Sequence, residues 1–97
     1  MTSTSSLAGK RVLVTGGGRG IGAAIVRRLA SQGATVAVNY RSDRAAVDAL
    51  VGELRDTGCA ASAFPADVSD VAQTHELVGA VVSEFGGLDL LVSASQY

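Results

Sequence analysis

Four short apolar runs alternate along this chain with three segments of helical period, and this alternation restricts the fold more than any other feature. The runs cover residues 11–15, 34–40, 59–64 and 88–92. Runs of this length that are apolar on both faces are typical of parallel strands with helices above and below the sheet. Right-handed crossovers then predict an α/β fold, a doubly wound parallel sheet of four strands in the order 3-2-1-4 with three helices.

The three intervening segments are predicted to be amphipathic helices, because their apolar residues recur at spacings of three and four. In chain order these residues are Ile21, Ala24, Ile25 and Leu29; Val47, Leu50, Val51 and Leu54; and Val71, Val78, Val81, Val82 and Phe85. We expect Ser42 or Asp43 to cap the second helix and Ser69 or Asp70 to cap the third.

Composition excludes several classes of protein. The chain has 97 residues, of which 47% are hydrophobic, and a formal net charge of -1, so it carries no basic excess for nucleic-acid binding. One cysteine excludes an intrachain disulfide, and no apolar run reaches the ~18 residues of a membrane span. Residues 1–8 are predicted to be a disordered arm without signal-peptide features, and residues 9–97 one domain in a cytoplasmic protein.

A cluster of glycines separates the first predicted strand from the first helix. Five of the twelve glycines lie within seven residues, at positions 16, 17, 18, 20 and 22. Such a turn lets a pyrophosphate approach bare main chain, and the following helix directs its N–H groups at the phosphates. The glycines could instead serve the turn alone. Their place at the point where the strand order reverses favours phosphate binding.

Three segments together resemble the short-chain dehydrogenase/reductase family over residues 7–92. Thr15-Gly-Gly-Gly-Arg-Gly-Ile-Gly22 resembles the family's T-G-x-x-x-G-I-G signature. Asp67-Val68 resembles its D-V pair after the third strand, and Phe85-Gly-Gly-Leu-Asp-Leu-Leu-Val92 its approach to the fourth strand. The resemblance implies a Rossmann-like fold and an NAD(P)-dependent oxidoreductase that transfers hydride between the cofactor and a carbonyl or alcohol.

The resemblance also assigns roles to individual residues. It implies that Asp67, next to Val68, accepts a hydrogen bond from the adenine amino group, although a turn or helix-capping role is the alternative for this carboxylate. It implies that the glycine segment holds the nicotinamide dinucleotide. The residues expected to do so are Gly16, Gly18, Arg19, Gly20, Ile21 and Gly22.

The end of the second predicted strand favours NADP(H) over NAD(H). An NAD site places a carboxylate about 20 residues past the glycines to bind the ribose 2′-hydroxyl. Here Tyr40 stands at that place, followed by Arg41, while Arg19 lies in the glycine turn. Two arginines suit a 2′-phosphate, because each charge-assisted hydrogen bond contributes roughly 1.5–3 kcal/mol. The alternative is that both arginines are solvated surface charges.

The catalytic residues of the resembled family, a Ser and a Tyr-x-x-x-Lys pair, are absent. The two tyrosines are Tyr40 and Tyr97, and the lone lysine, Lys10, precedes both. Ser93-Ala-Ser-Gln96 replaces the family's N-N-A-G segment, although Ser93 is still expected to approach a ribose. We therefore predict a truncated, N-terminal cofactor-binding half of such an enzyme that is catalytically incompetent alone.

The last predicted strand, residues 88–92, would leave an unpaired apolar edge, and such edges pair with other chains. We expect it to join a second copy, or a missing C-terminal half. The alternative function is therefore a non-catalytic module that binds a dinucleotide or assembles through this strand. At the start of the strand, Asp89 is expected to serve the turn.

Overall fold

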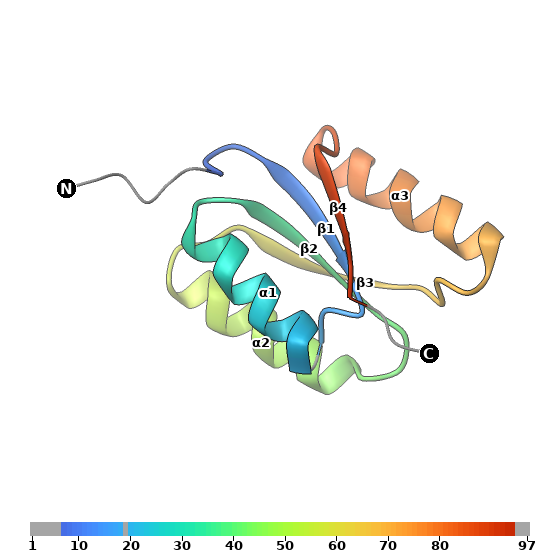
Figure 1. The fold of residues 1–97 in the computed structure, drawn as a ribbon, viewed down its shortest axis with the longest axis horizontal. Helices are drawn as coiled ribbons and strands as arrows, with labels where there is room; N and C mark the ends of the chain where they lie inside the picture. The colour runs from blue at the N-terminus through green and yellow to red at the C-terminus, as the bar shows by residue number, and fades with distance from the viewer. Residues whose placement is uncertain (1–6, 19, 95–97) are drawn as a thin grey trace.

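The computed structural model describes residues 7–18 and 20–94 of the chain (Figure 1). The elements in chain order are β1 (Arg11–Thr15), α1 (Gly20–Ser31), β2 (Thr35–Tyr40), α2 (Arg44–Asp56), β3 (Ala61–Pro65), α3 (Val71–Phe85) and β4 (Leu90–Ser93). The four strands form one parallel sheet in the order β3-β2-β1-β4. Helices α1 and α2 cover one face and α3 covers the other, which confirms the predicted doubly wound fold.

The strand register aligns the carboxyl ends of the strands along one edge of the sheet. Thr15, the last residue of β1, is paired with Ser93 of β4. On the other side, Val14 is paired with Val38 of β2, and Asn39 is paired with Phe64 of β3. Because all strands are parallel, the loops that follow them open at this same edge, where doubly wound sheets bind their ligands.

Alternate residues of the two central strands enter two different apolar layers. In β1, Val12 and Val14 pack with α1 and α2, whereas Leu13 packs in the layer that includes Leu77 and Val81 of α3. In β2, Val36 and Val38 likewise face α1 and α2, whereas Ala37 faces α3. The apolar residues of these strands are continuous in sequence because both faces of the sheet are buried.

The buried face of α1 differs from the expected stripe. Its buried residues are Gly22, Ala23, Val26 and Ala30. Ile25 and Leu29 flank this face, whereas Ala24 is exposed and Ile21 is 66% exposed. Small residues occupy the face because the start of the helix lies directly against the glycine turn, where a larger side chain has no room.

The buried stripe of α3 also differs from the expected one. Leu77 and Val81 are its buried residues, and Val78 and Phe85 pack beside them. Val71 is 73% exposed and Val82 is 41% exposed, since no second helix of the described chain lies next to α3 on that face (Figure 1). The expected stripe of α2 is confirmed, because the four residues predicted to form it are buried: Val47, Leu50, Val51 and Leu54.

The last two strands begin later than predicted. β3 starts at Ala61, because the chain at Cys59 still closes the end of α2 through a hydrogen bond from its N–H to the Leu54 oxygen. β4 starts at Leu90, because Leu88 packs with the α3 layer and Asp89 binds Arg11.

The predicted N-terminal arm falls largely outside the described residues, which begin at Leu7. Leu7 belongs to a turn, and its N–H donates to the Gln32 oxygen. Within residues 7–18 and 20–94, no helix is long and apolar enough to cross a membrane.

Candidate functional site

A cleft of about 760 Å³ lies at the carboxyl edge of the sheet. It collects residues from the glycine turn, the end of β2, the loop between β3 and α3, the first half of α3, and the end of β4. The predicted site residues that line it are Gly16, Gly18, Gly20, Ile21, Gly22, Tyr40, Arg41, Asp67, Val68 and Ser93. The remaining one, Arg19, lies outside the described residues.

The glycine turn forms the floor of this cleft through backbone geometry that other residues would disturb. Gly16 has a φ of 68°, a conformation that residues with a Cβ rarely adopt. At Gly22 a Cβ would overlap the carbonyl oxygen of Gly16. The first turn of α1 therefore lies on bare main chain, which is the arrangement that exposes N–H groups to a phosphate.

The end of β2 supplies a polar wall without a carboxylate at its last residue. Tyr40 is half-buried, and the Arg41 side chain is 75% exposed beside it. The Nε atom of Arg41 lies 3.7 Å from Oδ2 of Asp67, across the cleft from β2 to the loop after β3. An exposed pair at this distance is weak, so Arg41 remains available to a bound anion.

The loop after β3 presents the Asp67 carboxylate to the cleft. Oδ1 of Asp67 accepts from the Ser69 hydroxyl at 2.6 Å and from the Ser69 N–H at 3.0 Å. These hydrogen bonds, and to a smaller degree the charge of Arg41, hold the pKa of Asp67 below its ordinary value. The turn role considered for Asp67 is thus present, and its side chain, 31% exposed, also lines the cleft.

Asn39 is the polar residue that links these segments, and sequence analysis missed it. Its side chain is buried at the end of β2, between the glycine turn and the chain after β3. Oδ1 accepts from the Gly16 N–H at 3.2 Å, and Nδ2 donates to the Phe64 and Ala66 oxygens, each at 3.2 Å. A polar side chain inside an otherwise apolar strand was the signal that could have identified it.

The cleft also contains polar residues that the sequence did not predict as site residues, although three of them were expected as candidate helix caps. They are Ser42, Asp43, Ser69 and Thr74. Asp43 occupies the N-cap position of α2, without a side-chain capping hydrogen bond. Asp70 caps α3, because its Oδ1 accepts from the Gln73 N–H at 3.1 Å.

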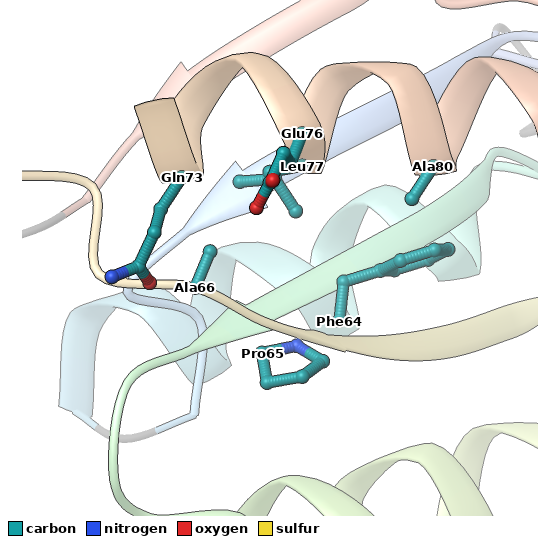
Figure 2. Close-up of a pocket in the computed structure, with 7 residues that line it drawn as sticks. All are labelled: Phe64, Pro65, Ala66, Gln73, Glu76, Leu77 and Ala80. Carbon is teal, nitrogen blue, oxygen red and sulfur yellow. The ribbon is translucent and has the colours of Figure 1, made fainter. Parts of the chain in front are cut away.

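A smaller cavity of about 270 Å³ lies between β3 and α3 (Figure 2). Its walls are Phe64, Pro65 and Ala66 on one side and Gln73, Glu76, Leu77 and Ala80 of α3 on the other. Ala66 and Leu77 also border the larger cleft. The smaller cavity includes no residue of the glycine turn, so we assign the candidate function to the larger cleft. In the described part of the chain, no cluster of three His, Cys, Asp or Glu side chains could hold a metal ion.

Comparison with known proteins agrees with this assignment. A curated relative, the short chain dehydrogenase/reductase AacuN of Aspergillus aculeatus, is 51% identical over 90% of this chain and 33% of its own length. A solved dehydrogenase/reductase from Sinorhizobium meliloti superposes with a TM-score of 0.91 at 45% identity, covering 96% of this chain and 37% of that one. A short chain dehydrogenase from Burkholderia cenocepacia, solved in complex with NADP, superposes with a TM-score of 0.84 at 47% identity, covering 88% and 35%.

The chain thus spans about a third of the length of the relatives it matches. The family model described as short chain dehydrogenase matches residues 10–95, nearly the whole chain. Together with the doubly wound sheet and the glycine turn at its switch point, this match establishes the family. The chain belongs to the short-chain dehydrogenases.

Proposed function

We propose that the larger cleft binds NADP(H), and that the chain is the cofactor-binding portion of a longer short-chain oxidoreductase. The observation that carries the proposal is the meeting of three motif segments in one cleft: the glycine turn, Tyr40 with Arg41, and Asp67. The N–H groups at the start of α1 would hold the pyrophosphate. Asp67 would accept a hydrogen bond from the adenine amino group.

The preference for NADP(H) over NAD(H) rests on Arg41. The end of β2 carries Tyr40 and then this arginine, where an NAD site would carry a carboxylate. Arg41 lines the cleft, and its pair with Asp67 at 3.7 Å is exposed and weak, so its guanidinium can form a charge-assisted hydrogen bond with a 2′-phosphate. The acidic residue of the same loop, Asp43, follows two residues after Arg41, at the N-cap of α2, and also lines the cleft.

When bound, NADPH would supply the hydride for reduction of a carbonyl. We assign that step to the longer protein, because the sequence holds no Tyr-x-x-x-Lys pair. The part of the chain described above binds and orients the dinucleotide. A cytoplasmic location remains a prediction from the sequence.

The proposal is tested by titrating the purified chain with NADPH and with NADH and following nicotinamide fluorescence. We expect saturable binding that is tighter for NADPH. Arg41→Ala is expected to weaken NADPH binding about tenfold or more, since a charge-assisted hydrogen bond contributes roughly 1.5–3 kcal/mol, and to change NADH binding much less. Arg28→Ala, an exposed arginine near the other end of α1, is the matched control and should change neither.

Two results would contradict the proposal. Absence of NADPH binding by the folded chain would remove the cofactor assignment altogether. Equal losses for NADPH and NADH in Arg41→Ala would keep the dinucleotide site but remove the preference for the 2′-phosphate.

A second candidate function, assembly through β4, is favoured by a specific observation. Leu90 is 45% exposed and Leu91 is 60% exposed, and β4 is paired on one side only, with β1. We propose that this strand joins a second copy of the chain or the remaining portion of a longer protein. The test is self-association of the purified chain.

A further inference from the structure

We propose that Asn39 is a positioning residue that sets the distance between the two halves of the cofactor cleft, an inference that rests on the proposed NADP(H) binding. One half is the glycine turn, where the phosphates would lie. The other is the chain from Ala66 to Ser69, where the adenine would lie. Asn39 is the described side chain that hydrogen-bonds both.

The geometry uses both ends of the carboxamide. Oδ1 accepts from the Gly16 N–H at 3.2 Å, while the two hydrogens of the amide group are shared among three backbone oxygens on its other side. These acceptors belong to Phe64 at 3.2 Å, Ala66 at 3.2 Å and Tyr40 at 3.4 Å. Only one orientation of the carboxamide presents an acceptor to the N–H and a donor to the oxygens.

The backbone of Asn39 reinforces the same connection. Its carbonyl oxygen accepts from the Gly17 N–H at 3.1 Å, so the glycine turn is bound to this residue twice. On the other side, the Ala66 N–H donates to the Tyr40 oxygen at 2.9 Å. Asp67 follows Ala66 directly, so a shift of Ala66 would move the carboxylate that is proposed to meet the adenine.

Burial makes this residue hard to replace by water or by another side chain. Asn39 is 2% exposed. A buried oxygen that loses its donor is costly, whereas an exposed one is resolvated. The chain would therefore relieve the loss by moving the Ala66–Ser69 segment away from β2, and the cleft would widen on its adenine side.

The experiment is the isosteric substitution Asn39→Asp, with binding of NADP⁺ measured by calorimetry as a function of pH. The carboxylate keeps an acceptor for Gly16 but turns a negative oxygen towards the Phe64 and Ala66 oxygens. We expect affinity at about pH 8 to fall at least about tenfold relative to the unaltered chain at the same pH. Because burial and the neighbouring oxygens raise the pKa of such a carboxyl, it should be protonated by about pH 5.5 and donate again.

The expected signature is thus a recovery of affinity on acidification that the unaltered chain does not show. A loss caused only by destabilisation of the fold would also appear as a lower unfolding midpoint without ligand, so this midpoint is measured at both pH values. Ala49→Glu, on the exposed surface of α2, adds the same charge away from the cleft and should show neither the loss nor the recovery. Thermal unfolding followed by circular dichroism would establish that each variant is folded.

A second measurement decides the question if Asn39→Asp does not fold. In the unaltered chain, adenosine 2′-monophosphate carries the adenine end of the ligand without the pyrophosphate. We expect it to slow hydrogen exchange of the Gly16 N–H several-fold, because Asn39 connects that group to the Ala66 segment. An exchange rate that stays the same with bound nucleotide would overturn the inference.

The experiments distinguish a failure of the cofactor proposal from a failure of the Asn39 proposal. If the unaltered chain binds no NADP⁺, the cofactor proposal is wrong. If it binds NADP⁺ and Asn39→Asp binds equally well at about pH 8, or stays equally weak at both pH values, only the role of Asn39 is wrong.

Discussion

Gly22 shows how a single residue without a side chain holds a helix against a turn. It lies in the first turn of α1, where helix propensity alone would favour alanine. A Cβ there would overlap the Gly16 oxygen and lie 2.9 Å from the Gly17 Cα, both of which are backbone atoms that cannot rotate away. The glycine is therefore required by close approach and not by a positive φ.

Gly22→Ala is expected to destabilise the chain by roughly 1–3 kcal/mol, the usual effect of overpacking. The matched substitution Gly52→Ala lies on the exposed side of α2, where a Cβ would meet nothing within 4 Å. It should stabilise the chain by roughly 0.5–1 kcal/mol. Urea denaturation measures both, and a Gly22→Ala midpoint at or above that of the unaltered chain would contradict the packing argument.

An ion pair joins the start of β1 to the residue that precedes β4. The Nε atom of Arg11 lies 2.9 Å from Oδ2 of Asp89, and the Arg11 N–H donates to the same oxygen at 2.8 Å. A turn role was expected for Asp89, whereas the structure shows its carboxylate hydrogen-bonded to Arg11, 78 positions away in sequence. These hydrogen bonds lower the pKa of Asp89 from 3.8 to about 2.

Because the pKa of Asp89 is lowered, the contribution of the Arg11–Asp89 pair to the free energy of unfolding depends on pH. Because the folded-state pKa lies below the unfolded one, the stabilisation is complete above 3.8 and is lost as the pH falls towards about 2. We expect the urea midpoint of the unaltered chain to exceed that of Asp89→Asn near neutral pH, with the two converging across this window. A difference that persists unchanged to the acid end would show that the ion pair is not its source.

The pattern of apolar residues predicted where the helices and strands lie better than it predicted which side of each helix is buried. Periodicity located α1 but assigned Ile21 to its buried side, since hydrophobicity alone cannot show that Gly22 and Ala23 are the residues in contact with the turn. The same limitation applies to α3, whose exposed Val71 and Val82 look like core residues in sequence. In the candidate site, the motifs predicted ten of the residues that line the cleft. The role of Asn39 was not predicted, because it depends on carbonyl oxygens that are 25 and 27 positions away in sequence.

The two faces of the sheet are covered unequally by helices. Two helices pack on one face and one on the other (Figure 1). The exposed large apolar residues include Val82 on α3 and both leucines of β4, of which Leu91, paired with Leu13, lies on the less covered side. An apolar strand with an open edge is a site of pairing with another chain.

The isolated chain is therefore expected to self-associate, and Leu90→Lys to shift it towards the monomer. Leu90 begins β4 and does not line the cleft, so a charge there should oppose pairing without altering the proposed cofactor site. Sedimentation velocity over a range of concentrations measures the effect, and Ala45→Lys on the exposed surface of α2 is the control. Monomeric behaviour of the unaltered chain at all concentrations would exclude this assembly.

The strand order also has a consequence for synthesis on the ribosome. Each of β1, β2 and β3 lies beside the strand made just before or just after it, so this part of the sheet can form while the chain is still emerging. The other edge of β1 must wait for β4, whose first residue is made 75 positions after Thr15. Until β4 has been synthesised, this edge of β1 stays unpaired, and a chaperone that binds nascent apolar strand edges could bind it.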